Sequence, residues 1–310
     1  MTCLACSAHH SAVAPLAPSQ EAQLAAVVHP AYLKASTMAA VRSQLESQGA
    51  ALLASFLRPE IAAALAHAAL AADRRDGLDG GEMPSTGPPY AAGTRRPGWR
   101  LLGPPQLRRY LRYRPRPATA AEVEGHGADG DAGDAGDAGG AEGEGGGTRR
   151  LRGVGAQLEA VREVMSSAPF VQWLALLSGL TPRSCAAEVR RFRPGLDYSL
   201  AHVGTQCTHE TLDATLTFVA SRAEECAAWE SGDVGGFECH VQASEEDHGA
   251  ADVYKADESS AGVTSIHPQT NALSLVRRGT DTMKFIKYVS AAAPGSRWDV
   301  AASYVCGAML

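Results

Sequence analysis

The feature that most limits the fold of this sequence is a change of hydrophobic period at Pro182. Beyond it, apolar residues recur at every second position in short segments, and turn residues such as Pro194-Gly195 and Pro294-Gly295 separate those segments. Short alternating segments without helices between them are typical of β-sandwiches and jelly rolls. The predicted strands are 187–193, 197–203, 212–220, 236–242, 251–255, 263–267, 272–277, 283–289 and 298–305.

Helical spacing occupies the chain before Pro182. From residue 37 apolar residues follow a helical period, and Gly49 and the Arg58-Pro59 step divide the run into two helices. Ser55 is the predicted N-cap of the second helix. Two more helices are predicted, at 151–165 and 167–177. The sequence therefore predicts an α+β fold, with helices first and a sandwich or jelly-roll barrel after them.

These patterns divide the chain into four segments. Residues 1–28 are rich in Ala, Ser and Pro and are predicted to be a disordered leader. Residues 29–118 form the helical segment that opens the domain, and residues 151–310 hold the remaining helices and the barrel. Between them, residues 119–150 form an acidic insertion of low complexity, composed mostly of Gly, Asp and Ala. Its apolar content is too small to offset the entropy of ordering, so we expect it to be flexible.

Three segments have residue types that are common in ligand sites. Cys3, Cys6 and the adjacent His9-His10 suggest a metal site, but a stable zinc site needs a folded shell, and an unstructured terminus is favoured. The aspartates of the insertion lack the final bidentate Glu of a calcium loop. Residues 77–118 mix Gly and Pro with Arg and aromatic residues. We interpret them as an irregular surface loop and not as a nucleic-acid arm.

Composition restricts the class of protein. The 28 basic and 34 acidic residues give a net charge of -6, which does not support nucleic acid as the main partner. The seven cysteines are irregularly spaced, as in proteins of reducing compartments. No apolar stretch approaches the roughly 20 residues of a membrane helix, and no secretory signal is present. We therefore expect a soluble protein of the cytoplasm or nucleus that has no membrane contact.

The barrel segment also carries motifs in a fixed order. They are Arg190-Arg191-Phe192-Arg193-Pro194-Gly195-Leu196-Asp197-Tyr198, Trp229, Gly235-Gly236-Phe237, Lys284-Phe285-Ile286-Lys287-Tyr288 and Arg297-Trp298-Asp299. This set resembles the prolyl-hydroxylase branch of the 2-oxoglutarate oxygenases and, most closely, the C-terminal domain of the ribosomal prolyl hydroxylases. The likeness extends over residues 29 to 305, interrupted by the acidic insertion. The motif positions expected to be structural are Arg191, Phe192, Gly195, Tyr198, Trp229, Gly235, Gly236, Lys284, Phe285, Lys287, Tyr288, Trp298 and Asp299.

The resemblance implies a double-stranded β-helix, which is a jelly-roll, cupin-like barrel, with the N-terminal helices packed on it. Members of this family hold two such barrels in tandem. The N-terminal barrel binds iron and hydroxylates a proline of a small-subunit ribosomal protein, and the C-terminal barrel is a degenerate copy. This chain resembles the copy, and the residues before position 29 are too few for a second barrel. Fe(II), 2-oxoglutarate and ascorbate are therefore expected only for the catalytic half, and no cofactor for this chain.

The ligand pattern of an iron oxygenase is incomplete in this sequence. A non-haem iron site needs His-x-Asp or His-x-Glu on an early strand and a second His on a late one. None of the ten histidines has an acidic residue two positions later, and no His follows His267. His202 is nearest to the expected first ligand, so it is a vestigial metal-ligand candidate. A packed core histidine is favoured.

Arg297 lies where the family's catalytic barrel places the arginine that binds 2-oxoglutarate, so it is a candidate vestigial anchor. An arginine fork suits a carboxylate. However, a structural ion pair is favoured, with Asp299 or Asp213 as the partner.

These observations predict a non-catalytic domain for protein binding or scaffolding. Its expected partners are a catalytic oxygenase domain and ribosomal or translation-termination proteins, without direct nucleic-acid contact. The basic pairs Arg190-Arg191 and Arg277-Arg278 are predicted to lie on the contact surface. One alternative is an active Fe(II)/2-oxoglutarate dioxygenase, a peptidyl-proline hydroxylase with an atypical metal site at His202. Another is a barrel that binds a small carboxylate through Arg297.

Overall fold

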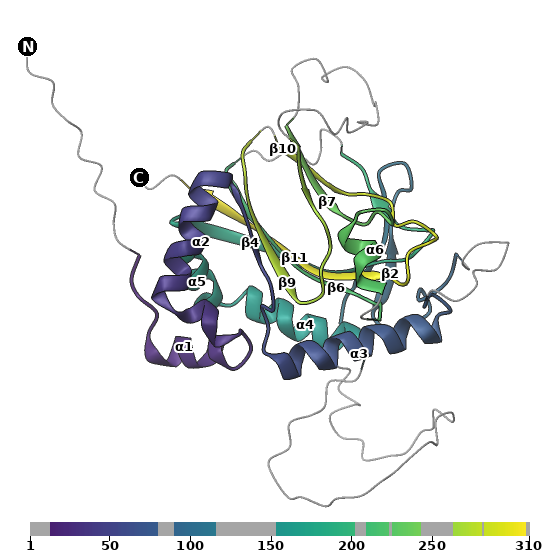
Figure 1. Cartoon of the computed structure of the whole chain (residues 1–310), viewed down its shortest axis with the longest axis horizontal. Helices are drawn as coiled ribbons and strands as arrows, with labels where there is room; N and C mark the ends of the chain where they lie inside the picture. Colours follow the sequence, from purple (N-terminus) through teal and green to yellow (C-terminus); the bar gives the residue numbers. More distant parts are fainter. Residues whose placement is uncertain are drawn as a thin grey trace, which may run out of the picture.

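Helices cover one face of a large antiparallel sheet, and a small sheet lies over its other face (Figure 1). The computed structural model describes residues 13–79, 90–115, 153–201, 209–222, 225–242, 263–280 and 282–307. The predicted strand 251–255, the acidic insertion 119–150 and the Cys3–His10 cluster lie outside the described residues. No helix in the described ranges is long and apolar enough to cross a membrane.

Most of the helices precede residue 180 and most of the strands follow it, which is an α+β order. The helices are α1 (Pro18–Ala25), the 3-10 turn η1 (Pro30–Leu33), α2 (Ala35–Gln48), α3 (Pro59–Arg75), α4 (Val154–Met165), α5 (Ala168–Ser178) and α6 (Cys226–Glu230). The strands are β1 (Ala50–Leu53), β2 (Trp99–Leu102), β3 (Arg108–Tyr113), β4 (Thr181–Phe192), β5 (Tyr198–Ser199), β6 (Thr211–Val219), β7 (Glu238–Gln242), β8 (Val263–Ile266), β9 (Ala272–Arg278), β10 (Thr282–Ile286) and β11 (Arg297–Gly307).

Strands distant in sequence are neighbours in the sheets. The large sheet has the order β1-β9-β6-β11-β4-β3-β2, with β5 paired to β3, and the small sheet has the order β10-β7-β8. The last strand, β11, lies between β4 and β6 and is antiparallel to both. From β6 onward the chain passes repeatedly between the two sheets, as in a double-stranded β-helix. The predicted fold class is confirmed.

The main apolar core lies between the helices and the large sheet. Along β6 and β11, alternate side chains such as Leu216 and Val300 face the helices and are fully buried there. Trp173 of α5 lies in the same core, and its indole nitrogen donates to the carbonyl of Tyr32 at 2.9 Å. A smaller apolar cluster around Trp229 lies on the other side of the sheet, against β10 and the segment that follows it.

The prediction of a disordered leader up to residue 28 is wrong for its last part. Residues 18–25 form α1, whose Leu24 is 1% exposed, and Val28 forms a β-bridge with Leu57. Leu24 is the only buried residue of this helix, so the sequence shows no repeating apolar face there.

Two other local predictions differ from the structure. The strand β1 separates α2 from α3, and Ser55 has a φ of 51° and is not an N-cap, because α3 begins at Pro59 after Arg58. The segment 77–118 is not wholly irregular, because β2 and β3 form a hairpin within it. Both strands are short, and one face of the hairpin is rich in arginine, which masks the usual alternation.

We expect Gly235→Ala to destabilise the fold, because Gly235 has a φ of 70° and a Cβ there would lie 2.0 Å from the carbonyl oxygen of Tyr288. The left-handed backbone alone costs about 1–2 kcal/mol in a residue with a Cβ. The free energy of unfolding should therefore fall by at least about 2 kcal/mol in urea denaturation.

The matched control is Gly279→Ala, whose added Cβ has nothing nearer than the Thr282 hydroxyl at 4.0 Å. We expect it to change stability by less than about 0.5 kcal/mol. Equal stability of both variants would show that Gly235 is not required at this close approach.

Candidate functional site

Buried charged side chains gather in the space between the two sheets. Seven charged side chains from six strands meet there, and we call them the charge network: Arg190, Asp213, Glu238, Arg278, Lys284, Arg297 and Asp299. Each is at most 13% exposed. Strand alternation produces this arrangement, because the apolar residues of β6 and β11 face the helices and the intervening residues face the small sheet.

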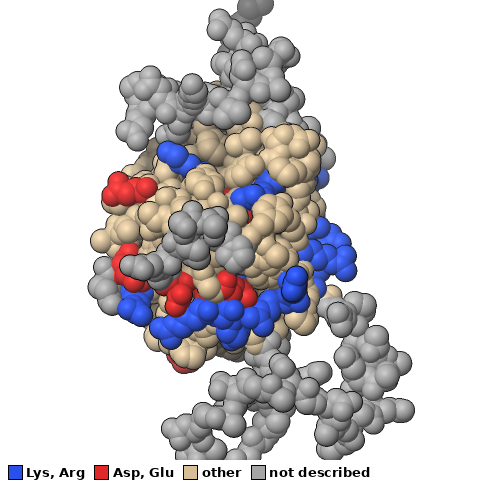
Figure 2. All heavy atoms as spheres, turned by 90° about the vertical axis from the view of Figure 1, so that its right-hand side faces the viewer, with Lys and Arg blue, Asp and Glu red and all other residues tan. Residues whose placement is uncertain are grey.

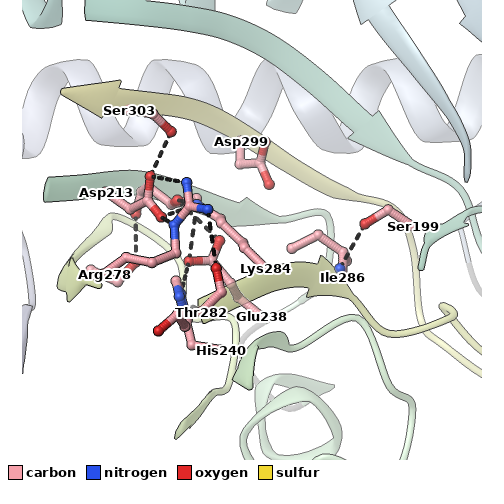
Figure 3. Close-up of polar contacts among 12 residues, drawn as sticks. Ser199, Asp213, Glu238, His240, Arg278, Thr282, Lys284, Ile286, Asp299 and Ser303 are labelled. Carbon is pink, nitrogen blue, oxygen red and sulfur yellow. Dashed lines mark hydrogen bonds and ion pairs between the residues drawn. The ribbon is translucent and has the colours of Figure 1, made fainter. Parts of the chain in front are cut away.

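Lys284 lies at the centre of the charge network (Figure 3). Its ammonium is 3.2 Å from Glu238 Oε1 and 3.9 Å from Asp213 Oδ2, and it donates a hydrogen bond to the Thr215 hydroxyl at 3.1 Å. Glu238 belongs to the small sheet and Asp213 to the large one. A single cation therefore joins the two sheets through two carboxylates.

Arginines neutralise the other side of each carboxylate. Arg278 Nε donates to Asp213 Oδ2 at 2.7 Å, and Arg190 binds Asp299 through Nε at 2.7 Å and Nη2 at 3.0 Å. Arg297 Nε donates to the same Asp299 at 3.0 Å, and its Nη2 lies 3.7 Å from Glu238. Each of the three carboxylates thus contacts two cationic side chains. Fork-shaped donors on carboxylates are among the strong charged contacts in proteins.

These contacts keep the two central carboxyls ionised. Burial by itself raises the pKa of Glu238, but Lys284, His240 and Arg297 outweigh it and hold that pKa well below its ordinary value. His240 Nε2 lies 2.9 Å from Glu238 Oε1. The pKa of Asp213 is likewise lowered, because Lys284 and Arg278 outweigh the effect of burial. The charge network is therefore ionic at neutral pH.

Of the two partners considered for Arg297, the structure pairs it with Asp299. Arg297 is 1% exposed, and its Nη1 donates to the carbonyl of Gly236. It lines a cavity of about 10 Å³ together with Glu238, and not the cavity of about 190 Å³ in the barrel. That cavity is bounded by Leu107, Arg108, Tyr110, Arg190, Ser199, Leu200, Arg278, Lys284, Phe285 and Ile286. The other predicted candidate, His202, lies outside the described residues.

Several family-motif residues hold the barrel to its surroundings. Arg191 binds Asp73 at 2.8 Å and Asp76 at 2.5 Å, and its guanidinium lies 4.3 Å from the centre of the Trp298 ring, so it ties α3 to the large sheet. Gly195 has a φ of 68° and donates its N–H to the carbonyl of Val289 at 2.9 Å.

The remaining motif residues lie in the small apolar cluster or near the surface. Phe192 and Trp229 are fully buried in the cluster between the sheets. Tyr198 donates to the carbonyl of Pro105 at 2.5 Å. The ammonium of Lys287 lies 4.7 Å from the centre of the Phe237 ring. Gly236 donates to the carbonyl of Lys287 at 3.2 Å, and Tyr288 is 46% exposed.

The prediction that two basic pairs form a contact surface is wrong for three of the four residues. Arg190, Arg191 and Arg278 are buried and paired with carboxylates, and only Arg277 is partly exposed, at 32% of its side chain. Their acidic partners lie far away in the sequence, on other elements. Alternation alone could not reveal this, because a charged strand face that meets solvent has the same pattern as one that meets a second charged face.

The described donor set does not fit an iron site. Within the described ranges, no group of three His, Cys, Asp or Glu side chains is placed to hold a metal ion. The nearest combination is Asp213, Glu238 and His240, but the Lys284 ammonium already lies between the two carboxylates. A divalent cation at this position would meet a fixed positive charge, which disfavours it strongly.

We expect Glu238→Gln to lower the free energy of unfolding by about 3 kcal/mol at neutral pH, because it leaves Lys284 and Arg297 without their shared buried carboxylate. Urea denaturation measures this loss. Glu46→Gln, which removes an exposed partner of Arg42 on α2, is the control and should change stability by less than about 1 kcal/mol.

The stability lost in Glu238→Gln should become smaller at low pH. The folded-state pKa of Glu238 is below its ordinary value of 4.5, so its stabilising effect is present above that value and disappears as the pH falls through the folded pKa. The difference in stability between the natural protein and Glu238→Gln should therefore shrink below pH 4.5. A difference that stays constant down to acid unfolding would contradict an ionised Glu238.

Solved structures similar to this chain include oxygenases of low sequence identity. One is a prolyl hydroxylase from Trichoplax adhaerens in complex with a hypoxia inducible factor peptide, with 12% identity, a TM-score of 0.43 and coverage of 87% of this chain and 90% of that one. Another is a Pseudomonas putida prolyl-4-hydroxylase, with 12% identity, a TM-score of 0.42 and coverage of 86% and 98%.

Sequence comparison gives a closer match over nearly the whole chain. Prolyl 3,4-dihydroxylase OGFOD1 of Ostreococcus tauri is 30% identical over 283 residues, which cover 89% of this chain and 47% of that protein. The chain therefore spans about half the length of this relative. The model of the family described as oxoglutarate and iron-dependent oxygenase degradation C-term matches residues 19–309, and the chain belongs to that family.

Proposed function

We propose that this chain is the non-catalytic C-terminal domain of a 2-oxoglutarate- and iron-dependent prolyl hydroxylase, and that it serves protein binding or scaffolding. The catalytic domain would hydroxylate a proline of a small-subunit ribosomal protein and would use Fe(II), 2-oxoglutarate and ascorbate. Family membership, and a relative named as a prolyl 3,4-dihydroxylase of about twice the length, support this assignment. The proposed partners are the catalytic domain and ribosomal or translation-termination proteins, in the cytoplasm or nucleus.

The observation that carries the proposal is the position of Lys284. Its ammonium lies between Glu238 and Asp213, where a metal would need the same carboxylate oxygens. Oxygen activation needs three protein donors on one face of the iron and open positions opposite them. The carboxylates of the charge network are committed to lysine and arginine, and breaking these pairs would leave buried charges without partners.

We expect no stoichiometric binding of metal or 2-oxoglutarate. The measurement is anaerobic calorimetric titration with Mn(II) in place of Fe(II), with and without 2-oxoglutarate. His202→Ala and Lys284→Met are titrated in parallel, because the first removes the vestigial ligand candidate and the second removes the central cation.

The alternative function, an active dioxygenase with an atypical site, makes the opposite prediction. Tight binding of one Mn(II) per chain that requires 2-oxoglutarate and is lost in His202→Ala would overturn the non-catalytic assignment. Binding that appears only in Lys284→Met would support it, because the ammonium would then be the group that excludes the metal.

A chimera tests the supporting role. In the Ostreococcus tauri relative, the segment that matches this chain is either deleted or replaced by this chain. We expect deletion to reduce hydroxylation of a small-subunit ribosomal protein, measured by mass spectrometry, and replacement to restore most of it. Undiminished hydroxylation after deletion would show that this domain is not needed by the catalytic half.

A further inference from the structure

We propose that a carboxylate-rich segment of a partner protein docks on an arginine patch formed by Arg100, Arg108, Arg112 and Arg114 on and next to the β2–β3 hairpin. This inference rests on the proposed function as a protein-binding domain, and it states the chemistry of the partner. The patch lies in the segment that the sequence analysis interpreted as an irregular surface loop.

The strand register places these arginines on one face. Successive side chains of a strand alternate, so Arg108, Tyr110 and Arg112 of β3 point to the same side, and Arg114 continues the series just beyond the strand. Arg100 of β2 is directly opposite Arg112, and Arg112 is directly opposite Arg190 of β4. Arginines therefore stand side by side across three neighbouring strands.

This arrangement is costly unless an anion is present. Like charges directly opposite each other on antiparallel strands destabilise the pair. In the part of the chain that the structure describes, only Glu188 brings a carboxylate to the arginine patch, at 3.6 Å from Arg112. Arg100, Arg108 and Arg114 are exposed, and no described carboxylate lies within ion-pair distance of them. The patch thus has several cations for one carboxylate.

Glu188 shows how a carboxylate fits on this face. One of its oxygens accepts the Tyr110 hydroxyl at 3.0 Å, and the other faces Arg112. Arg108 and Tyr110 also line the cavity of about 190 Å³, where the described lining residues include cationic side chains and no carboxylate. The mouth of the barrel and the arginine patch therefore form one cationic surface. Arginine is suited to it, because its planar fork binds carboxylates through two parallel hydrogen bonds.

Figure 2 shows Lys and Arg side chains on the side of the molecule that carries the β2–β3 hairpin. It looks at the side where β2 and the end of α3 lie, and Lys and Arg side chains form a band across the lower part of this face. Acidic side chains gather above one half of the band and leave the other half without visible acidic neighbours.

Two observations favour an acidic protein segment over a nucleic acid. The whole chain has a net charge of -6, so a long polyanion is repelled by the molecule as a whole, whereas a short acidic segment needs only the local patch. In addition, β2 is the edge strand of the large sheet among the described strands. An edge strand offers backbone hydrogen bonds to an extended peptide, which a nucleic acid cannot use in the same way.

The test is fluorescence anisotropy of a labelled oligo-glutamate peptide titrated with the full chain. We expect saturable binding that weakens as salt is added, because exposed charges are screened. The double variant Arg100→Glu, Arg114→Glu should weaken binding by about tenfold or more. The control is the double variant Lys34→Glu, Arg42→Glu, which changes the net charge by the same amount. Both residues are exposed, Lys34 at the N-terminal end of α2 and Arg42 within it. This helix lies at the opposite end of the molecule from β2 in Figure 1.

Two further titrations test whether the acidic insertion or a nucleic acid occupies the patch. The chain has eight Asp and Glu between positions 119 and 148, so the titration is repeated on a form in which these are Asn and Gln, to remove a tethered competitor. Absence of binding in both forms overturns the proposal, and so does equal weakening in the control variant. If a single-stranded RNA with the same number of negative charges binds more tightly than the peptide, the occupant of the patch is a nucleic acid and not an acidic protein segment.

Failure of this inference is distinct from failure of the proposed function. A chain that binds neither metal nor acidic peptide overturns only the arginine patch as a docking site. Stoichiometric metal binding overturns the non-catalytic assignment, whatever the peptide does.

Discussion

The Lys284 ammonium between Glu238 and Asp213 is the contact on which the arrangement of the barrel depends, because it joins the two sheets through charge. In most sandwiches the inner faces of the sheets meet through apolar side chains. Here the inner faces meet through buried ion pairs and hydrogen bonds next to the small apolar cluster around Trp229, while the larger apolar core lies on the outer side of the large sheet, beneath the helices. The helices are therefore part of the core and not an accessory layer.

This division explains how the fold tolerates so many buried charges. A buried ion pair seldom adds net stability, because the loss of hydration offsets the attraction. The apolar contacts of β6 and β11 with the helices supply the burial that the inner face lacks. The charge network then acts as a set of fixed partners, since each of its three carboxylates contacts two cations.

The same charges link the interior to the proposed docking surface. Arg190 pairs with Asp299 inside the barrel and stands opposite Arg112 on the neighbouring strand. The row of arginines is thus balanced by carboxylates at its inner end, and at its outer end, within the described part of the chain, by Glu188 alone. A barrel whose interior is lined by ion pairs has strong local fields at its mouth. Such fields suit recognition of a charged partner without any chemistry.

The sequence by itself determined the α+β order, most of the helices and strands and the family, but not α1, β1 or the β2–β3 hairpin. Period-two segments after Pro182 identified the strands, and the absence of any His-x-Asp or His-x-Glu pattern showed that the usual iron ligands are missing. These properties are local, since each depends on residues a few positions apart. The tertiary structure decided which strand faces are buried, because β6 is buried on both faces although its alternation resembles that of a half-exposed strand. It also decided that Arg190 and Arg278 are interior residues, since their carboxylate partners lie 109 and 65 positions away and only the folding of the sheets brings them together.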